Sequence, residues 1–311
     1  MFSQSLKYFS LLFTSYLLIA SLSSDYSFAQ QESEIKVLAV IAHPDDESGM
    51  AATIYKITHD LHGKVDIALV TNGEGGYKYS TLAEAYYNLE LTREEIGREY
   101  LPAIRKRELM NAGKILGIRN YFFLDQKDHK YTLDVQEVFQ KIWDTSFVKR
   151  RLREIIDRGK YDFVFTPLPT PETHGHHKGA AILALQAVSG MRNAHKPIVL
   201  GVSVTSKKDS VKKIFSELEN FPITRINLHA SPFIFDRTQS FGFKKRLNYK
   251  VIVNWEIAEH KSQGTMQLYM NEGDYENYWF YSLNDEKGVE RAAHLFGQLK
   301  INTYPKLEYQ E

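Results

Sequence analysis

The sequence predicts an α/β protein with a Rossmann-like, doubly wound and mostly parallel sheet that carries helices on both faces. Apolar runs at 37–42 and within 161–167 are typical of interior strands of a parallel sheet. Amphipathic stretches at 103–116 and 135–156 separate such runs and predict helices. Charged residues follow both runs, at the strand ends where open α/β sheets bind ligands.

The first elements alternate between strand and helix. A strand at 36–42 is followed by a helix over about 47–61, which we expect to end at Gly63, a residue type suited to a helix C-cap. A second strand is expected at 64–71. The helix at 103–116 has an apolar face and stops at Gly117. The intervening segment from Gly73 to Pro102 follows a strand, so we expect it on the ligand side of the sheet, as a candidate lid.

The same alternation continues towards the C-terminus. The predicted elements are a strand at 120–124, an amphipathic stretch at 135–156, a strand at 161–167, a helix at 177–188 and a strand at 197–204. From about residue 205 we expect strands at 249–254 and 278–281 and a final helix at 287–299, as additions to the same domain. A single domain over residues 30–311 is therefore predicted.

Residues 1–29 are expected to be a signal peptide rather than part of the fold. Lys7 provides a basic start, 9–22 is mostly apolar, and Ser27 and Ala29 are small residues at the positions that precede a cleavage site. Cleavage after Ala29 would give a secreted or periplasmic protein with no stable membrane span. An uncleaved anchor remains the alternative, although the apolar stretch is short for a span of about 20 residues.

Composition is that of a globular enzyme without disulfides. The 311 residues are 43% hydrophobic and 25% charged, which is enough to build one large core. The net charge of +1 argues against a nucleic acid partner. The chain has no cysteine, so disulfides and a lipid-modified cysteine are excluded. Nothing in the sequence fixes the oligomeric state.

Two clusters of polar residues follow the strands at 36–42 and 161–167. The first is His43, Pro44, Asp45, Asp46 and Glu47, and the second runs from 170 to 177 and contains three histidines. A catalytic zinc ion takes three protein ligands and leaves a position open for water. His43, Asp46 and one histidine of the second cluster would complete such a set.

The two clusters together resemble the LmbE-like, or PIG-L, family of zinc-dependent de-N-acetylases. The resemblance rests on Ala-His-Pro-Asp-Asp-Glu at 42–47, His-x-x-His at 174–177 and Arg-Lys-Arg-Glu at 105–108. It extends from about residue 37 to 185, with a weaker match at 258–263, where the family often has a histidine or lysine before Ser-Gln.

The resemblance implies a metal site and a catalytic pair. By analogy, His43, Asp46 and His177 bind Zn²⁺, although Fe²⁺ or another divalent ion can replace zinc at such ligands. Asp45 is then the general base, and His174 stabilises the tetrahedral intermediate or protonates the leaving amine. In this family zinc activates water and polarises the carbonyl group of the amide.

The second motif departs from the family pattern. The usual sequence is His-Pro-Asp-His, whereas this chain has His-Gly-His-His at 174–177. The ligands are unaffected, but the carboxylate of the usual motif is missing. Hydrogen bonds from such a residue to a metal ligand are worth 10- to 100-fold in affinity or activity.

Residues outside the two motifs are weaker candidates for substrate contacts. The resemblance implies that Arg105 contacts substrate, and Tyr77 and Tyr79 could stack on a sugar ring or simply pack against the helix at 103–116. His260 is a candidate for lining the pocket. Glu47 is expected to interact with free amide groups at a helix start.

Other polar residues have mostly structural interpretations. His59 and His62 share the His-x-x-His spacing but are expected to be solvated at a helix end. Asp125, Asp128 and His129 follow a strand, and a minority role in substrate contact is left open for them.

Three functions fit these observations. The favoured one is hydrolysis of the N-acetyl group of an amino sugar such as N-acetylglucosamine, free or in a glycoconjugate. The alternatives are hydrolysis of another amide or ester and carbohydrate binding without catalysis. Dinucleotide binding is disfavoured, because the first turn after the strand is acidic where that function needs glycines.

Overall fold

The computed structural model describes residues 34–191, 196–209, 214–230 and 232–301. The unit that begins at Ile35 contains the entire sheet. The predicted signal peptide at 1–29 lies outside the described residues. Within the part of the chain that the structure describes, no helix is long and apolar enough to cross a membrane.

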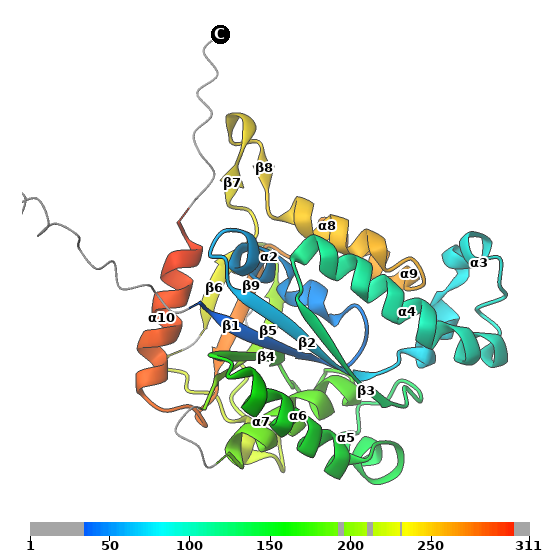
Figure 1. Cartoon of the computed structure of the whole chain (residues 1–311), viewed down its shortest axis with the longest axis horizontal. Helices are drawn as coiled ribbons and strands as arrows, with labels where there is room; N and C mark the ends of the chain where they lie inside the picture. Colours follow the sequence, from blue (N-terminus) through cyan, green and yellow to red (C-terminus); the bar gives the residue numbers. More distant parts are fainter. Residues whose placement is uncertain (1–33, 192–195, 210–213, 231, 302–311) are drawn as a thin grey trace, which may run out of the picture. The chain divides into compact units, whose positions relative to one another are not determined.

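A seven-stranded sheet with the order β3-β2-β1-β4-β5-β9-β6 forms the centre of this unit (Figure 1). The first five strands in that order are parallel: β3 (Asn120–Gln126), β2 (Lys64–Thr71), β1 (Lys36–Ile41), β4 (Phe163–Pro167) and β5 (Ile198–Thr205). β9 (Tyr275–Phe280) pairs antiparallel with β5, and β6 (Phe233–Asp236) pairs antiparallel with β9. The predicted fold class, a mostly parallel doubly wound sheet, is confirmed.

Helices cover both faces of the sheet because successive side chains of its strands point to opposite sides. In β1, Val37 and Ala39 face a core shared with α2 (Ala51–His59), α4 (Glu94–Leu116), α8 (Lys250–Glu259) and α10 (Lys287–Leu299). Leu38 and Val40 face the opposite core, shared with α6 (Thr145–Gly159) and α7 (Gly175–Ser189). All four of these β1 side chains are fully buried.

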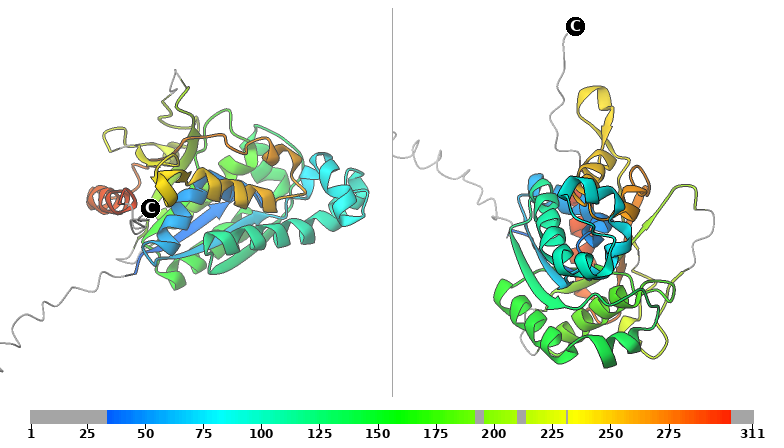
Figure 2. Two further views of the ribbon diagram at one scale, coloured as in Figure 1. Left: turned by 90° about the horizontal axis from the view of Figure 1, so that it is seen from above. Right: turned by 90° about the vertical axis from the view of Figure 1, so that its right-hand side faces the viewer.

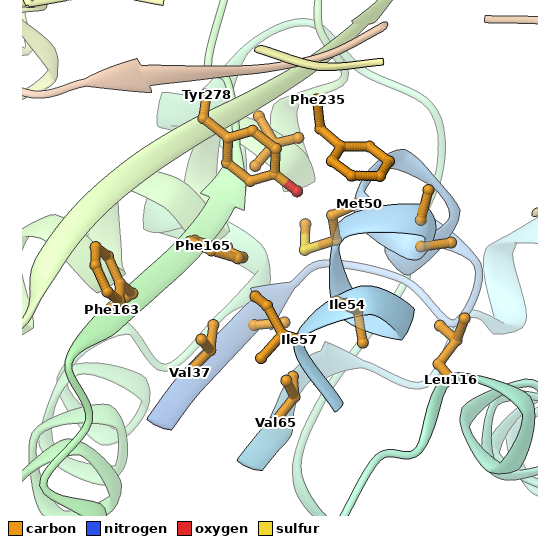
Figure 3. Close-up of a cluster of buried hydrophobic side chains, with 14 of the residues drawn as sticks. Val37, Met50, Ile54, Ile57, Val65, Leu116, Phe163, Phe165, Phe235 and Tyr278 are labelled. Carbon is orange, nitrogen blue, oxygen red and sulfur yellow. The ribbon is translucent and has the colours of Figure 1, made fainter. Parts of the chain in front are cut away.

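The core on the α2 side joins residues that are far apart in the sequence. Figure 3 shows Ile54 and Ile57 of α2 above Val37, with Tyr278 and Phe235 at the other side of the cluster. Strands from the C-terminal third are thus part of the main core rather than an appendage.

Several predicted elements have different boundaries in the structure. The helix expected at 47–61 is a 3₁₀ turn, η1 (Asp46–Met50), followed by α2, which ends at His59. Gly63 is not its cap, because the left-handed residue after the helix is His62, with φ 54°. The stretch at 135–156 is helical in two parts, since the chain breaks between η3 (Val138–Ile142) and α6.

The segment expected as a loop from Gly73 to Pro102 is mostly helical. It contains η2 (Glu74–Tyr79), α3 (Thr81–Tyr87) and the first nine residues of α4, which runs through Pro102 to a left-handed C-cap at Gly117. Pro102 suggests a helix start because it lacks an N–H, yet here it stands inside the helix. The predicted end at Gly117 is confirmed.

The segment at 249–254 is not a strand. It begins α8, whose buried residues Ile252, Val253, Glu256 and Ile257 have helical spacing. This face packs beside α4 and α2, as Figures 1 and 2 show. Tertiary packing therefore overrides the β-branched composition of the segment. Smaller C-terminal elements complete the chain: η4 (Pro222–Thr224), β7 (Ser240–Phe241), η5 (Phe243–Lys245), β8 (Leu247–Asn248) and α9 (Gly264–Gln267).

Candidate metal centre and active site

The two histidine-containing motifs meet at the carboxyl edge of the sheet. β1 and β4 are parallel neighbours, with Val37 opposite Phe163, so their carboxyl ends lie side by side. The first motif follows β1 and continues into η1, and the second follows β4 and forms the first turn of α7. The sequence-based expectation that these residues converge is met by the structure.

Three donor atoms from these motifs face a common point. His177 Nε2 lies 2.9 Å from Asp46 Oδ1 and 3.0 Å from His43 Nδ1, and His43 Nδ1 lies 3.7 Å from Asp46 Oδ1. A tetrahedral ion with bonds of about 2.1 Å holds its ligands about 3.4 Å apart. The three atoms therefore fit a single divalent cation.

The carboxylate of Asp46 is fixed by the backbone of its own turn. Its Oδ2 accepts hydrogen bonds from the amide groups of Ala42 and His43 at 2.8 and 2.9 Å. Oδ1 remains directed at His177. The adjacent His177 charge and hydrogen bond hold the pKa of Asp46 well below its usual range, despite the opposing effect of burial. This carboxylate is thus prepared to be an anionic ligand.

Asp45 lies at the same carboxyl edge of the sheet, and its backbone conformation is strained. Its φ of 139° is a conformation that residues with a side chain rarely adopt. Two contacts hold it there: its amide donates to Glu47 Oε2 at 3.0 Å, and its Oδ2 accepts from Arg105 Nη2 at 3.0 Å. Burial raises the pKa of Asp45 to about 6, against the lowering effect of Arg105. The strained backbone at this buried carboxylate marks Asp45 as a candidate functional residue.

His174 stands beside the three donor atoms, at the residue before α7. Its ring centroid lies 5.3 Å from that of His43 and 4.9 Å from that of Tyr131. Burial, reinforced by the neighbouring imidazoles, lowers the pKa of His174 to about 3, so its ring is neutral. A neutral imidazole can donate one hydrogen bond to a reacting oxygen or nitrogen.

His176 and Asp128 are site residues whose role the sequence did not reveal. His176 is fully buried, and its Nδ1 lies 3.2 Å from Asp128 Oδ1 and 3.0 Å from His43 Nε2. For Asp128, as for Asp125 and His129, the sequence left a role in substrate contact open. Asp125, by contrast, is exposed and pairs with Lys106. Only the tertiary structure shows that Asp128 reaches the site.

Arg105 and His260 are buried next to the first motif and are not among the residues that line the cavity beside it. Arg105 is 1% exposed and its guanidinium donates to Pro44 O as well as to Asp45. His260 is 0% exposed, with Nε2 2.7 Å from Glu47 Oε1. These contacts support Asp45 and Glu47, and substrate contact by Arg105 or His260 stays a prediction. Glu47 does bind an amide at the helix start, as expected, but its second oxygen faces His260.

The two candidate tyrosines have different surroundings. Tyr77 packs against α4, next to Leu101 and Ile104, and the guanidinium of Arg98 lies 5.3 Å from its ring centroid. This is the packing alternative considered for it. Tyr79 is 48% exposed, so a substrate contact by Tyr79 stays a prediction.

A cavity of about 330 Å³ opens beside Asp45, Asp46 and His177. Its other lining residues come from η1, the end of β4 and the segment after it, the second half of β5, and α9. They are Ser48, Gly49, Met50, Pro167, Leu168, Thr170, Thr173, Val202, Ser203, Val204 and Met266. Among these described residues there is no lysine or arginine, and neither candidate tyrosine belongs to the lining.

Comparison with known proteins gives a family match over just under half of the chain. Residues 38–188 match the family model PIG-L, described as GlcNAc-PI de-N-acetylase. A probable N-acetyl-α-D-glucosaminyl L-malate deacetylase 2 from Bacillus cereus is 26% identical over 204 residues, which are 64% of this chain and 84% of the relative.

Solved structures share the fold at lower identity. The zinc-inhibited form of teicoplanin deacetylase Orf2 is 16% identical with a TM-score of 0.50, covering 81% of this chain and 99% of that one. GalB, the 4-carboxy-2-hydroxymuconate hydratase of Pseudomonas putida KT2440, is 15% identical with a TM-score of 0.50, covering 81% and 97%. One fold thus supports a deacetylase and a hydratase.

Proposed function

We propose that this protein, whose residues 38–188 match the PIG-L family model, is a metal-dependent hydrolase that removes the N-acetyl group from an amino sugar or glycoconjugate. The observation that carries the proposal is the convergence of His43 Nδ1, Asp46 Oδ1 and His177 Nε2 on one point beside Asp45. The match to the sugar-conjugate deacetylase from Bacillus cereus supports the substrate class.

His43, Asp46 and His177 would hold the metal. Two imidazoles and one carboxylate suit Zn²⁺, which is the ion we propose, and also suit Fe²⁺. A divalent metal bound at these atoms lowers the pKa of water and polarises the amide carbonyl. The protein contributes the fixed carboxylate of Asp46 and the open cavity next to the three donors.

Asp45 is proposed as the general base. It lines the cavity, and its hydrogen bonds with Arg105 and Glu47 fix where its carboxylate points. Asp46 is held by the backbone amides of its own turn, so the two adjacent carboxylates are separated in role. Asp45 accepts the proton of the attacking water and can later return it to the leaving nitrogen.

His174 is proposed to stabilise the tetrahedral intermediate or to protonate the leaving amine. Its ring is neutral and stands next to His43 at the edge of the donor set. A neutral donor stabilises developing negative charge on oxygen without repelling the metal.

The cavity favours a substrate whose remaining part is uncharged. Met50, Leu168 and Val202 form apolar walls, and Ser203 and Thr173 provide hydroxyl groups for a sugar. The malate group of the Bacillus substrate carries carboxylates, for which the described lining offers no cation. We therefore propose a neutral N-acetylated sugar or a glycoconjugate with an apolar aglycone.

Export of the protein is a separate proposal, which rests on the signal-like sequence at 1–29. Secretion or a periplasmic location with cleavage after Ala29 would follow. N-terminal sequencing of the protein from extracellular and periplasmic fractions tests this, and an intact Met1 would reject it.

The two alternative functions are separated by different observations. Hydrolysis of another amide or an ester would use the same residues, so only a comparison of substrates can distinguish it from N-acetyl hydrolysis. The hydratase with this fold shows that the fold alone does not fix the reaction. A carbohydrate-binding protein without catalysis has no use for a strained, buried carboxylate beside a metal site, which disfavours that alternative.

The test combines metal analysis with acetate release. We expect the purified protein to bind one equivalent of zinc and to release acetate from at least one member of a panel of N-acetylated sugars. His43→Ala and His177→Ala should lose both properties. His229→Ala is the matched control, because His229 is exposed and far from the two motifs in sequence.

Each outcome has a distinct meaning. Full zinc occupancy in His43→Ala and His177→Ala would reject the ligand assignment. Zinc binding by the wild type without acetate release, but with hydrolysis of other amides or esters, would favour the second alternative. No hydrolysis of any substrate would favour the binding protein.

A further inference from the structure

The outer side of α3 is apolar although it faces solvent. Leu82, Ala85 and Tyr86 stand at helical positions i, i+3 and i+4, so they share one side of the helix. Leu82 and Tyr86 are 71% and 66% exposed. Another side of α3 is apolar too, since Ala83 is buried in a cluster with Leu101 of α4. A surface helix normally has polar residues on its outer side, so the outer side of α3 has the character of a contact surface.

Two more exposed apolar side chains follow α9. Leu268 and Tyr269 are 78% and 59% exposed. Their amides donate to the carbonyl oxygens of Thr265 and Met266 at 3.2 and 2.9 Å, so the chain continues its helical turn beyond Gln267. Residues three apart in such a turn lie on the same side. Tyr269 therefore lies on the same side as Met266.

Met266 links this turn to the cavity of the candidate active site. It lines that cavity together with Asp45 and His177. The cavity volume of about 330 Å³ is at the lower end of the range of about 300 to 1,000 Å³ for small-molecule sites. Such a volume suits a single sugar residue, so an aglycone attached to that sugar extends past the rim of the cavity. Along the α9 wall, the exposed side chains that follow Met266 are those of Leu268 and Tyr269.

α3 and α9 lie next to each other, as Figure 1 shows. The Ser80 hydroxyl donates to Ser262 O at 2.9 Å, and Lys261 Nζ lies 5.6 Å from the centroid of the Tyr86 ring. These contacts join the start of α3 to the segment before α9. The exposed apolar side chains of the two helices therefore belong to neighbouring elements. We call them the apolar rim, which consists of Leu82, Tyr86, Leu268 and Tyr269.

The charges around the apolar rim favour a neutral ligand. α3 has one charged residue, Glu84, and no lysine or arginine. Lys261, beside Tyr86, pairs with Glu259 at 3.0 Å. A helix that binds a membrane surface instead carries lysine or arginine on its polar side. Since the described lining of the cavity also lacks cations, the cavity and the rim together suit an apolar ligand that begins in the cavity.

We propose that the apolar rim binds an alkyl chain in the aglycone of an N-acetylated amino sugar whose ring occupies the cavity. The inference rests on the proposed function, because it requires the N-acetyl group to lie at the metal site. It specifies the substrate class as amino-sugar glycosides with a lipid-like aglycone.

Acetate release from a matched pair of glycosides tests this inference. The sugar that the wild type deacetylates best is prepared with a methyl and with an octyl aglycone, and both are used below the concentration at which micelles form. Burial of one methylene group is worth about fourfold in binding. We therefore expect kcat/KM for the octyl glycoside to exceed that for the methyl glycoside by at least about 10-fold.

Substitutions in the apolar rim should remove this preference. Leu82→Ser and Leu268→Ser should each lower the ratio of the two kcat/KM values by about threefold or more, and the double variant should lower it further, at unchanged Tm. Leu82→Met/Leu268→Met keeps the apolar surface and should keep the ratio. Leu228→Ser is the matched control, because Leu228 is exposed and precedes β6, at the opposite edge of the sheet from β3.

The outcomes separate this inference from the proposed function. Equal kcat/KM for the two glycosides in the wild type would overturn the inference and leave the proposed function intact. A preference that persists in the serine double variant would mean that the chain binds elsewhere, and would also overturn it. So would a loss in the methionine variant as large as that in the serine variant, because the apolar surface is then not what matters.

Other occupants of the rim have their own signatures. With the ratio unchanged, loss of binding to phosphatidylcholine vesicles in the serine double variant would identify a bilayer as the occupant. Loss of a dimer in analytical ultracentrifugation would identify a second copy of the chain. Either result would overturn the assignment of the rim to an aglycone. A wild type that releases no acetate from any sugar would reject the proposed function and this inference together.

Discussion

Glu276 connects the C-terminal strand β9 to the helix that follows the first motif, and its replacement by glutamine is a sharp test of that connection. The side chain is fully buried. Its oxygens accept from the amides of Ala52 and Thr53, both at 3.0 Å, and from Arg237 Nε at 2.9 Å. Arg237 in turn donates to Ser48 O at 2.5 Å, in the wall of the cavity.

The cost of Glu276→Gln follows from these contacts. Glutamine has one acceptor oxygen, so its NH₂ group would face an amide donor at the start of α2. The charge of Arg237, which is 3% exposed, would lose its partner. Breaking a buried ion pair by removing one partner costs about 3 to 5 kcal/mol. For a domain of this size, that loss lowers Tm by roughly 10 °C.

Urea and thermal unfolding of the metal-free protein measure this cost. Glu272→Gln serves as the control, since Glu272 is exposed near the start of β9 and should change the free energy of unfolding by less than about 0.5 kcal/mol. The double variant Glu276→Gln/Arg237→Met should recover part of the loss, because the uncompensated charge is gone. A single Glu276→Gln variant as stable as Glu272→Gln would refute the reasoning.

Further predictions concern catalysis, pH and specificity. Asp45→Asn should keep its zinc but lower kcat for acetate release by about 10² to 10⁴, and an unchanged kcat would reject Asp45 as the base. His174→Ala should also retain zinc, and a metal-free variant would mean that His174 and His177 have exchanged roles. Burial raises the pKa of Glu256 to about 8 from an ordinary value of 4.5. The folded state then holds a proton that the unfolded chain releases, so the contribution of Glu256 to stability is fully present below pH 4.5 and is lost as pH rises towards 8. Urea midpoints at pH 5.5 and 8 should show a smaller decrease in Glu256→Gln, and an equal decrease would contradict this. Tyr79→Ala should change the ratio of kcat/KM between acetylated sugars at unchanged Tm, and a uniform loss with a lowered Tm would indicate packing instead.

The parallel part of the sheet was predictable because its signals are local. The run at 37–42 is apolar on both faces, and the strand at 64–71 and the helix end at Gly117 coincide with the observed elements. The predicted secondary structure is wrong where contacts between residues far apart in the sequence determine it. α4 continues through Pro102, and the segment at 249–254 is helical because one of its faces packs on α4 and α2.

The candidate site was predictable to the extent that its residues follow strands directly. His43, Asp46 and His177 were brought together by the topological argument that parallel strands share an edge. Asp128 follows β3, two strands away from β1 in the sheet, and only the loop after β3 carries it back to His43. Local sequence patterns do not predict the path of this loop, so the position of Asp128 beside His43 could not be predicted. The burial of Arg105 likewise depends on the turn at Gly73, whose carbonyl accepts from it.

The contacts of Glu276 and His260 also link the first motif to parts of the chain that lie outside the family match. The family match ends at residue 188, yet the helix start at Ala52 and the carboxylate of Glu47 are satisfied by side chains more than 200 residues later. A fragment cut at the end of the matched region would expose these buried groups and leave the β4 edge that pairs with β5 without a partner. The segment that matches the family model and the unit that holds the buried contacts therefore have different lengths, and any exchange of parts between relatives should keep α8 and β9 with the motif they support.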